Sequence, residues 1–344
     1  MAILPSWTYR GYSTKTWRRD GRVVEMNVDK LTNELKLQLQ ESCHSSVTVE
    51  FIKFSSNHNF KVAINGSQYF CRIYKGNKWS AEQILAELTF LTKARCAGLN
   101  VQSPVAFGRD ECLSKLENTN LHYSLFEWCP GVHRYPAIWD EDFVFSWGKA
   151  LGELHEFCKG YEETAGKRPA HMEVPWHSNL LNLLGQCGFD EQTISTFRDE
   201  HEQVQEFFSG LETSSDVYGY VHYDFHPGNI LVDGEDFWLI DFDDLCHHWF
   251  AWDFAMVFHK LSGKAMSHQN DKLKATFVKG YRTKTVLKFE WERRLRLFER
   301  IRHLFMIGWL ARKRDEEKWA WLLPRYAKVH SKYVREHTFG CELD

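Results

Sequence analysis

The segment 222–243 constrains this chain more than any other, because it ties two groups of polar residues to the two ends of an apolar hairpin. It opens with the pattern H-x-D-x-x-x-x-N, which contains Asp224 and ends at Asn229. The apolar run 230–240 then leads back to Asp241. A hairpin returns its second strand beside the start of its first. We therefore expect Asp224, Asn229 and Asp241 to lie close together.

These three side chains suit phosphoryl transfer. The reaction needs a divalent cation to neutralise phosphate charge, and Mg²⁺ prefers oxygen ligands. It also needs a carboxylate that accepts the proton of the attacking hydroxyl. The spacing predicts Asp224 as this base, with Asn229 and Asp241 as the Mg²⁺ ligands.

The same segment resembles the catalytic and metal-binding segments of the aminoglycoside phosphotransferase and choline kinase family. The family pattern H-G-D-x-H-x-x-N matches residues 222–229, with Tyr223 in place of the usual glycine. Asp253 matches a later aspartate that helps to hold the lobe of these enzymes together. Within the family, the chain looks nearest to the bacterial branch of YihE-like stress-response kinases and homoserine-kinase-like proteins. The resemblance implies a relative of the protein kinase fold, with ATP as phosphate donor and Mg²⁺ as cofactor.

The N-terminal half resembles the nucleotide-binding half of the same family. The residues that this resemblance implies for nucleotide binding are Arg72, Glu87, Ser55, Asn57, Phe126, Glu127 and Trp128. Arg72 stands where kinases keep a phosphate-contacting lysine, and Glu87 matches the helical glutamate that pairs with this cation. Residues 125–131 match the hinge whose backbone holds adenine. The polar loop 55–59 lacks the glycines of a kinase phosphate loop, which is a mild departure.

The apolar periodicity predicts an α+β chain. Alternating residues predict a strand at 47–54, and further strands are expected at 60–64, 68–74, 101–107 and 122–126. Helical spacing predicts helices at 29–40, 81–94 and 143–158. Asn65-Gly66 predicts a hairpin turn, and Ser80 with Gln83 has the spacing of a capping box. One β-like segment at 220–242 and a helical tail at 289–334 follow.

These elements predict a bilobal, protein-kinase-like fold with an antiparallel-sheet N-lobe and a mainly helical C-lobe. Cys129-Pro130-Gly131 interrupts the pattern and is the expected lobe boundary. We expect an arm and a short helix over 1–45, a nucleotide-binding N-lobe over 46–129, and a C-lobe over 130–344. The C-lobe would carry the catalytic loop, the metal site and the acceptor pocket.

Composition narrows the class of protein. The chain has 344 residues, 43% of them hydrophobic, and a formal net charge of −3, which gives no electrostatic argument for nucleic acid as a partner. Its nine cysteines form no C-x-x-C pair, which indicates reduced thiols. No secretory signal or membrane span is evident, so we expect a cytoplasmic protein. The basic residues of the first segment indicate a solvated arm, with an interaction tail as the alternative; they are Arg10, Lys15, Arg18, Arg19 and Arg22.

The acceptor is not defined by the sequence. A hydroxyl-bearing small molecule is the expected substrate, with a protein serine or threonine as the alternative. A non-catalytic nucleotide-binding scaffold is a further alternative, although Asp224, Asn229 and Asp241 are all present. Two weaker interpretations are a transition-metal site of His222, His226, His247 and His248, and a tryptophan-lined pocket for a cationic substrate. Asp243 and Asp244 would add negative charge near the acceptor, or only cap a helix.

Overall fold

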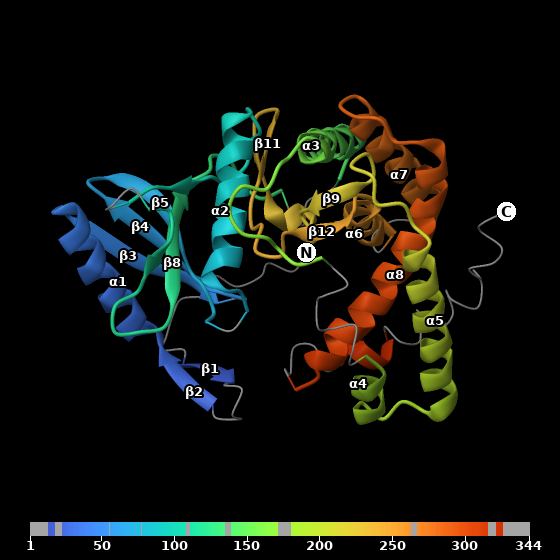
Figure 1. Ribbon diagram of the computed structural model, residues 1–344, viewed down its shortest axis with the longest axis horizontal. Helices are drawn as coiled ribbons and strands as arrows, with labels where there is room; N and C mark the ends of the chain where they lie inside the picture. Colours follow the sequence, from blue (N-terminus) through green and yellow to red (C-terminus); the bar gives the residue numbers. More distant parts are fainter. Residues whose placement is uncertain are drawn as a thin grey trace. The chain divides into compact units, whose positions relative to one another are not determined.

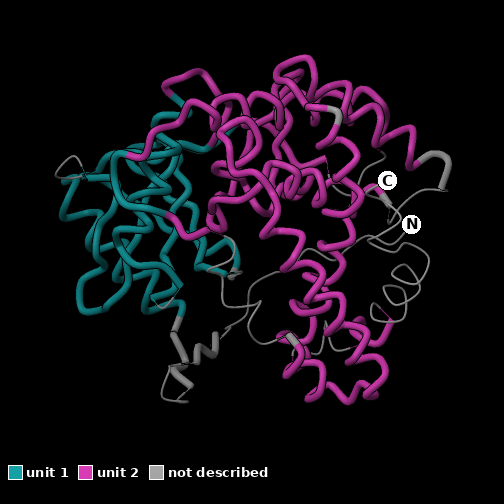
Figure 2. The backbone as a smooth tube through the Cα atoms, turned by 45° about the vertical axis from the view of Figure 1, so that its right-hand side comes forward, with its two compact units in different colours: residues 1–95, 102–129, 164–167 teal, residues 96–101, 130–163, 168–344 magenta. Residues whose placement is uncertain are grey.

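A computed structural model describes residues 13–17, 23–54, 56–76, 78–107, 111–134, 139–170, 180–262, 267–315 and 321–325. The chain divides into two compact units (Figure 2). Unit 1 comprises residues 1–95, 102–129 and 164–167, and unit 2 comprises residues 96–101, 130–163 and 168–344.

Unit 1 is built on an antiparallel sheet. Its elements are β1 (Ser13–Trp17), β2 (Val23–Asn27), α1 (Val28–Cys43), β3 (Val47–Phe54), β4 (His58–Ile64), β5 (Ser67–Ile73), α2 (Ala81–Cys96), β6 (Pro104–Val105), β7 (Ser114–Lys115) and β8 (His122–Glu127). The main sheet has the order β3-β4-β5-β8-β6, with β7 also paired to β8. Figure 1 labels β3, β4, β5 and β8 of this sheet. Asn65 and Gly66 join β4 to β5 with φ angles of 50° and 86°, so the predicted hairpin turn is confirmed.

The two faces of β5 contact different helices, because successive side chains of a strand point to opposite sides. Cys71 and Ile73 are fully buried in the core that α1 forms with the sheet. Arg72 lies between them in the strand and pairs with Glu87 of α2. The apolar face therefore fixes β5 on α1, and the opposite face presents the cation to α2.

Most of the predicted elements of unit 1 are confirmed. Ser80 and Gln83 form the capping box at α2, since each backbone N–H donates to the other's side chain at 3.0 and 3.2 Å. The strand predicted over 101–107 is shorter, because only Pro104–Val105 pairs with β8. The N-terminal arm contains the antiparallel pair β1–β2, which sequence periodicity did not indicate. Of its basic residues only Lys15 lies within the described residues.

Unit 2 is mainly helical around two small two-stranded sheets. Its elements are α3 (Glu141–Lys159), α4 (Leu180–Gln186), α5 (Glu191–Ser209), β9 (Tyr218–Val221), the 3₁₀ turn η3 (Pro227–Asn229), β10 (Ile230–Asp233), β11 (Asp236–Leu239), β12 (Cys246–Trp249), α6 (Ala251–Ser262), α7 (Ser267–Arg282) and α8 (Phe289–Arg312). Strand β10 pairs with β11, and β9 pairs with β12. The tail helix predicted over 289–334 begins at Phe289 as expected but ends at Arg312. Most of the predicted part beyond residue 315 lies outside the described residues.

Close packing of α3 against α7 positions a buried histidine. A Cβ atom added to Gly148 or Gly280 would collide with a backbone carbonyl of the opposite helix, so only glycine allows this approach. The contact brings Tyr281 of α7 to 3.1 Å from His155 of α3.

Within the described ranges, every helix is too short or too polar to cross a lipid bilayer. The eight cysteines in those ranges are free thiols.

Candidate active site

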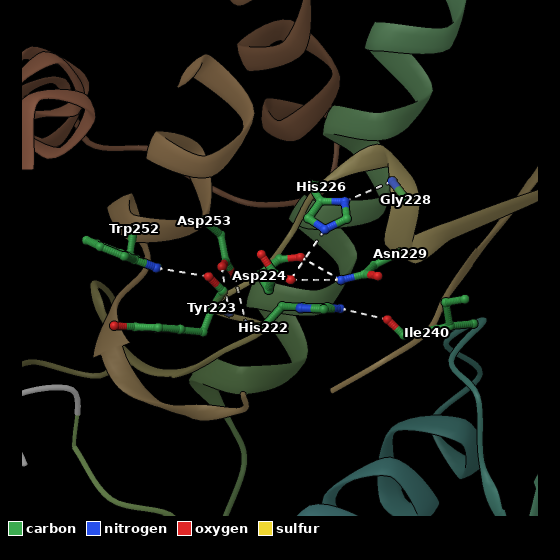
Figure 3. Close-up of polar contacts among 9 residues, drawn as sticks. All are labelled: His222, Tyr223, Asp224, His226, Gly228, Asn229, Ile240, Trp252 and Asp253. Carbon is green, nitrogen blue, oxygen red and sulfur yellow. Dashed lines mark hydrogen bonds and ion pairs between the residues drawn. The ribbon is translucent and has the colours of Figure 1, made fainter. Parts of the chain in front are cut away.

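The hairpin of β10 and β11 brings the two polar groups of the segment 222–243 together. Ile230 pairs with Leu239, and the register continues beyond the strands because the Ile240 N–H donates to the Asn229 carbonyl at 3.0 Å. Asp241 therefore follows directly after the residue that pairs with Asn229. Figure 3 shows His222 reaching the same place from the other end of the loop, where its Nε2 lies 3.0 Å from the Ile240 carbonyl oxygen.

Asp224 is held by two side chains of its own loop (Figure 3). The Asn229 Nδ2 donates to the Asp224 carbonyl at 3.0 Å and lies 3.3 Å from Oδ2. The His226 Nδ1 accepts from the Gly228 N–H at 2.9 Å, so the neutral ring carries its proton on Nε2. That Nε2 lies 3.3 Å from Asp224 Oδ2. The carboxylate is thus oriented, yet its side chain keeps 37% of its exposure.

The charges around Asp224 favour its ionised form. Burial alone would raise the pKa of this carboxyl, but the hydrogen bond from His226 and the positive charge of Arg302 outweigh burial and hold the pKa below its usual value. Arg302 is a cation at any physiological pH. Asp224 is therefore a carboxylate at neutral pH, which is the form that accepts a proton.

Asn229 and Asp241 carry the kinds of oxygen atom that bind Mg²⁺. Because both acceptors of Asp224 face the Asn229 Nδ2, the amide oxygen of Asn229 points to the other side. Amide and carboxylate oxygens are suitable ligands for Mg²⁺, which commonly takes its remaining ligands from water and phosphate. No group of three or more His, Cys, Asp or Glu side chains in the described part of the chain could hold a metal ion by itself.

Asp253 of α6 anchors the backbone of the loop that contains Asp224. Its carboxylate is fully buried and accepts the N–H groups of His222 and Tyr223, both at 2.9 Å. The His155 Nε2 lies 3.2 Å from the same carboxylate. Burial lowers the pKa of His155 despite the nearby Asp253, so the ring is neutral and donates through Nε2, while Nδ1 accepts from the Tyr281 hydroxyl. This matches the structural role that the family resemblance implied for Asp253.

Tyr223 fills space where the family usually has glycine. Its φ is 70°, a conformation that costs a non-glycine residue energy, so the surroundings must hold it. Trp252 does so: its ring stacks on Tyr223 at 5.0 Å, and its Nε1 donates to the Tyr223 carbonyl at 3.0 Å. The Arg302 guanidinium lies over Trp252 and Phe305 at 5.6 and 4.3 Å. Aromatic and cationic side chains therefore surround the residue beside Asp224.

Unit 1 contains a buried ion pair at the position of the expected phosphate-binding cation. The Arg72 Nη1 lies 2.7 Å from the Glu87 Oε1, and both side chains are almost fully buried. The guanidinium also lies over the Phe126 ring at 5.2 Å. Glu87 and Phe126 thus fix the direction of the Arg72 fork. The structure brings together three of the residues assigned to nucleotide binding.

The other assigned residues of unit 1 have different surroundings. Asn57 is buried, and its Oδ1 accepts the Lys75 N–H at 3.0 Å. The Glu127 N–H donates to the Ser103 carbonyl at 2.9 Å, so an adenine ring would need its backbone donor from another hinge residue. Trp128 is 42% exposed. Ser55 lies outside the described residues.

Arg72→Ala is expected to weaken nucleotide use more than Arg72→Lys, because lysine keeps the charge but loses the fork. Either change also affects the buried Glu87, so folding has to be separated from binding. The double variant Arg72→Met/Glu87→Gln removes the unpaired charge and should recover stability without recovering the KM for ATP. If Arg72→Ala retains the wild-type KM and kcat, the assignment of this strand is incorrect.

A family model gives independent evidence for the class of protein. The model of the phosphotransferase enzyme family matches residues 48–297, which include Arg72, Asp224 and Asp241. The chain belongs to the phosphotransferase enzyme family. It is therefore a kinase-type enzyme, as the catalytic segment predicted.

The relatives of this phosphotransferase include named kinases. Amicoumacin kinase of Bacillus subtilis (strain 168) is 23% identical over 299 residues, covering 83% of this chain and 88% of the relative. The structure of the amicoumacin kinase hAmiN in complex with AMP-PNP, Ca²⁺ and Ami superposes with a TM-score of 0.76, at 21% identity, over 89% of this chain and 96% of that one. The structure of a microcompartment-associated aminopropanol kinase superposes with a TM-score of 0.74, at 18% identity, over 92% of this chain and 99% of that one. The kinase-like α+β fold is confirmed.

Three residues of this arrangement were not found by sequence reasoning. They are His155, Tyr281 and Arg302, which come from α3, α7 and α8. Each is one of several polar residues in its helix, and the spacing of the apolar residues gives no sign of its partner. His155 follows Leu154 in a regular helical pattern, so the sequence shows the helix but not the contact.

Proposed function

We propose that this protein transfers the γ-phosphate of ATP to a hydroxyl group of a small molecule. In this proposal Asp224 accepts the proton of the attacking hydroxyl. Asn229 and Asp241 hold Mg²⁺, which supplies neutralisation of the phosphate charge when bound. Arg72, oriented by Glu87, contributes positive charge to the phosphates.

The observation that carries the proposal is the arrangement of the loop 222–241. Asp224 is ionised, oriented by two neighbours and still partly exposed, as a base must be to reach a substrate. The Asn229 Nδ2–H donates to Asp224, so the amide oxygen faces away from Asp224, and the Asn229 backbone pairs with Ile240, the residue before Asp241. In this proposal one amide orients the base and also supplies a metal ligand.

A small-molecule acceptor is favoured by the relatives. The two structures with the highest TM-scores given above are named as kinases of amicoumacin and of aminopropanol. The name aminopropanol describes a molecule with a hydroxyl and an amine. We therefore place amino alcohols first among the acceptors to be tested for this chain.

The wild-type protein should be stabilised by Mg²⁺·ATP. A ligand at a hundred times its Kd stabilises the native state by about 2.7 kcal/mol, so the melting temperature should rise by several degrees. ATP with EDTA serves as the control and should give a smaller shift. Folded protein that shows no shift at millimolar Mg²⁺·ATP would overturn the proposal.

Acceptor screening then separates the alternatives. Phosphate transfer should be measured with amino alcohols, sugars, amino acids with hydroxyl groups, and a generic protein substrate. Transfer to a small molecule supports the proposal, whereas transfer to the protein substrate alone would identify a protein kinase. Binding of Mg²⁺·ATP without transfer to any acceptor or to water would favour a non-catalytic scaffold.

A further inference from the structure

A short strap, residues 168–170, lies against the strand that follows the metal-binding segment. Ala170 forms a parallel bridge with His247 of β12, and the His247 N–H donates to the Pro169 carbonyl at 3.2 Å. The His247 Nδ1 lies 3.4 Å from the Arg168 carbonyl oxygen. Backbone contacts therefore fix the place of Arg168, although about 75 residues separate the strap from its partners in the chain.

The strap is also fixed from β9. The Tyr220 hydroxyl accepts the Arg168 N–H at 3.3 Å and donates to the Glu163 carboxylate. Burial and the hydrogen bond to Glu163 raise the pKa of Tyr220, so its hydroxyl stays protonated. The Tyr220 ring stacks on His247 with centroids 4.2 Å apart. The backbone of Arg168 is thus held in place by contacts with both β9 and β12.

The Arg168 side chain reaches the segment directly after Asp241. The guanidinium is fully buried, and its Nη2 donates to the Asp243 carbonyl at 2.6 Å and approaches the Phe242 carbonyl at 3.5 Å. The Phe242 carbonyl also accepts the Leu245 N–H at 2.9 Å. A bond from a charged donor is shorter and stronger than a neutral one. Burial of a charged guanidinium costs free energy, so a functional reason for placing Arg168 against these two carbonyl groups is expected.

The reason lies in the backbone of Asp241. Its φ is 65°, a left-handed conformation that a non-glycine residue keeps only where its surroundings impose it. Before Asp241, the Ile240 N–H and carbonyl are fixed by Asn229 and His222. After Asp241, the next two carbonyl groups face Arg168. The residue is therefore held on both sides of its strained position.

We infer that Arg168 is a positioning residue that orients Asp241 toward the metal. This inference rests on the proposed function, in which Asp241 is a Mg²⁺ ligand. Groups that orient a metal ligand without touching the metal affect metal affinity by about 10- to 100-fold when they are removed. A purely structural role would instead lower the melting temperature and leave metal affinity unchanged.

The test compares Arg168→Lys and Arg168→Met with a matched control. Arg300→Met removes another buried arginine of unit 2, one that pairs with Glu200 rather than with the segment 241–245. For each folded variant, Mg²⁺ is titrated at fixed ATP, and half-saturation is read from the rise in melting temperature. The KM for Mg²⁺ and kcat are measured separately once an acceptor is known.

Arg168→Met should raise the Mg²⁺ concentration for half-saturation by at least about 10-fold, and Arg168→Lys should raise it less, because lysine retains one charged donor. Arg300→Met should lower the melting temperature but leave the Mg²⁺ concentration for half-saturation at the wild-type value. If Arg168→Met does not fold, the Mg²⁺ concentration for half-saturation of Arg168→Lys tests the inference. Wild-type half-saturation in the Arg168 variants overturns the inference, whereas absence of any Mg²⁺·ATP shift in the wild type overturns the proposed function.

Discussion

Replacing Asp224 with asparagine is expected to lower kcat by about 10²–10⁴-fold, the usual contribution of a general base, while the Mg²⁺·ATP thermal shift stays nearly intact. Asparagine cannot accept the proton of the acceptor hydroxyl at neutral pH. It can still accept a hydrogen bond from the Asn229 Nδ2 through its side-chain oxygen, and the backbone bond at 3.0 Å does not depend on the side chain. The loop should therefore keep its shape.

The contrasting variant is Asp241→Asn, which removes a negative charge from a site that binds a hard cation. We expect both the Mg²⁺-dependent part of the thermal shift and turnover to fall. The change in side chain is the same in both variants, so Asp224→Asn is a matched control for size and polarity. Asp224→Asn should thus lose turnover alone, whereas Asp241→Asn should lose turnover and the Mg²⁺-dependent thermal shift.

The measurements are melting curves with and without Mg²⁺·ATP, and phosphate transfer to the identified acceptor or to water. One outcome would reverse the assignment: loss of nucleotide stabilisation in Asp224→Asn together with its retention in Asp241→Asn. Full turnover in Asp224→Asn would remove Asp224 from catalysis altogether. Neither result could be attributed to misfolding if the apo melting temperatures match the wild type.

Local features of the fold could be predicted because their causes are local. Asn65-Gly66 accepts positive φ, and Ser80 with Gln83 satisfies the first turn of α2, so both signals act within a few residues. The catalytic segment could be predicted for a related reason. Its hairpin returns Asp241 to Asn229 through pairing of neighbouring strands, which the apolar run between them already indicates.

The contacts that hold the site in place could not be predicted, because they join distant parts of the chain. Arg168 meets Asp243 across 75 residues, and His155 meets Asp253 across 98. Neither pair has a spacing or a composition that distinguishes it from many other pairs of polar residues. The strand predicted at 101–107 is shorter in the structure for a different reason. Only Pro104 and Val105 pair with β8, whereas Val101 and Phe107 form isolated bridges with Leu239 and Glu111.

The second large effect is expected for Asp253→Asn. Asp253 Oδ1 accepts the Tyr223 N–H, and Oδ2 accepts the N–H of His222 and lies 3.2 Å from His155 Nε2. An asparagine must turn its NH₂ group toward one of these two places. In either orientation a backbone N–H of the catalytic loop then faces a donor instead of an acceptor, and no water can relieve the conflict easily in a fully buried position.

A buried polar group without its partner costs about 1–3 kcal/mol, so the melting temperature of Asp253→Asn should fall by several degrees. Turnover should fall further than stability explains, because displacement of a catalytic group by about 1 Å can cost 10²-fold. Glu200→Gln is the matched control, since it changes another buried carboxylate of unit 2 whose partner is Arg300. Measured well below both melting temperatures, Glu200→Gln should retain turnover and Asp253→Asn should lose it. Equal turnover in the two variants would show that the buried carboxylate of Asp253 stabilises unit 2 without positioning Asp224.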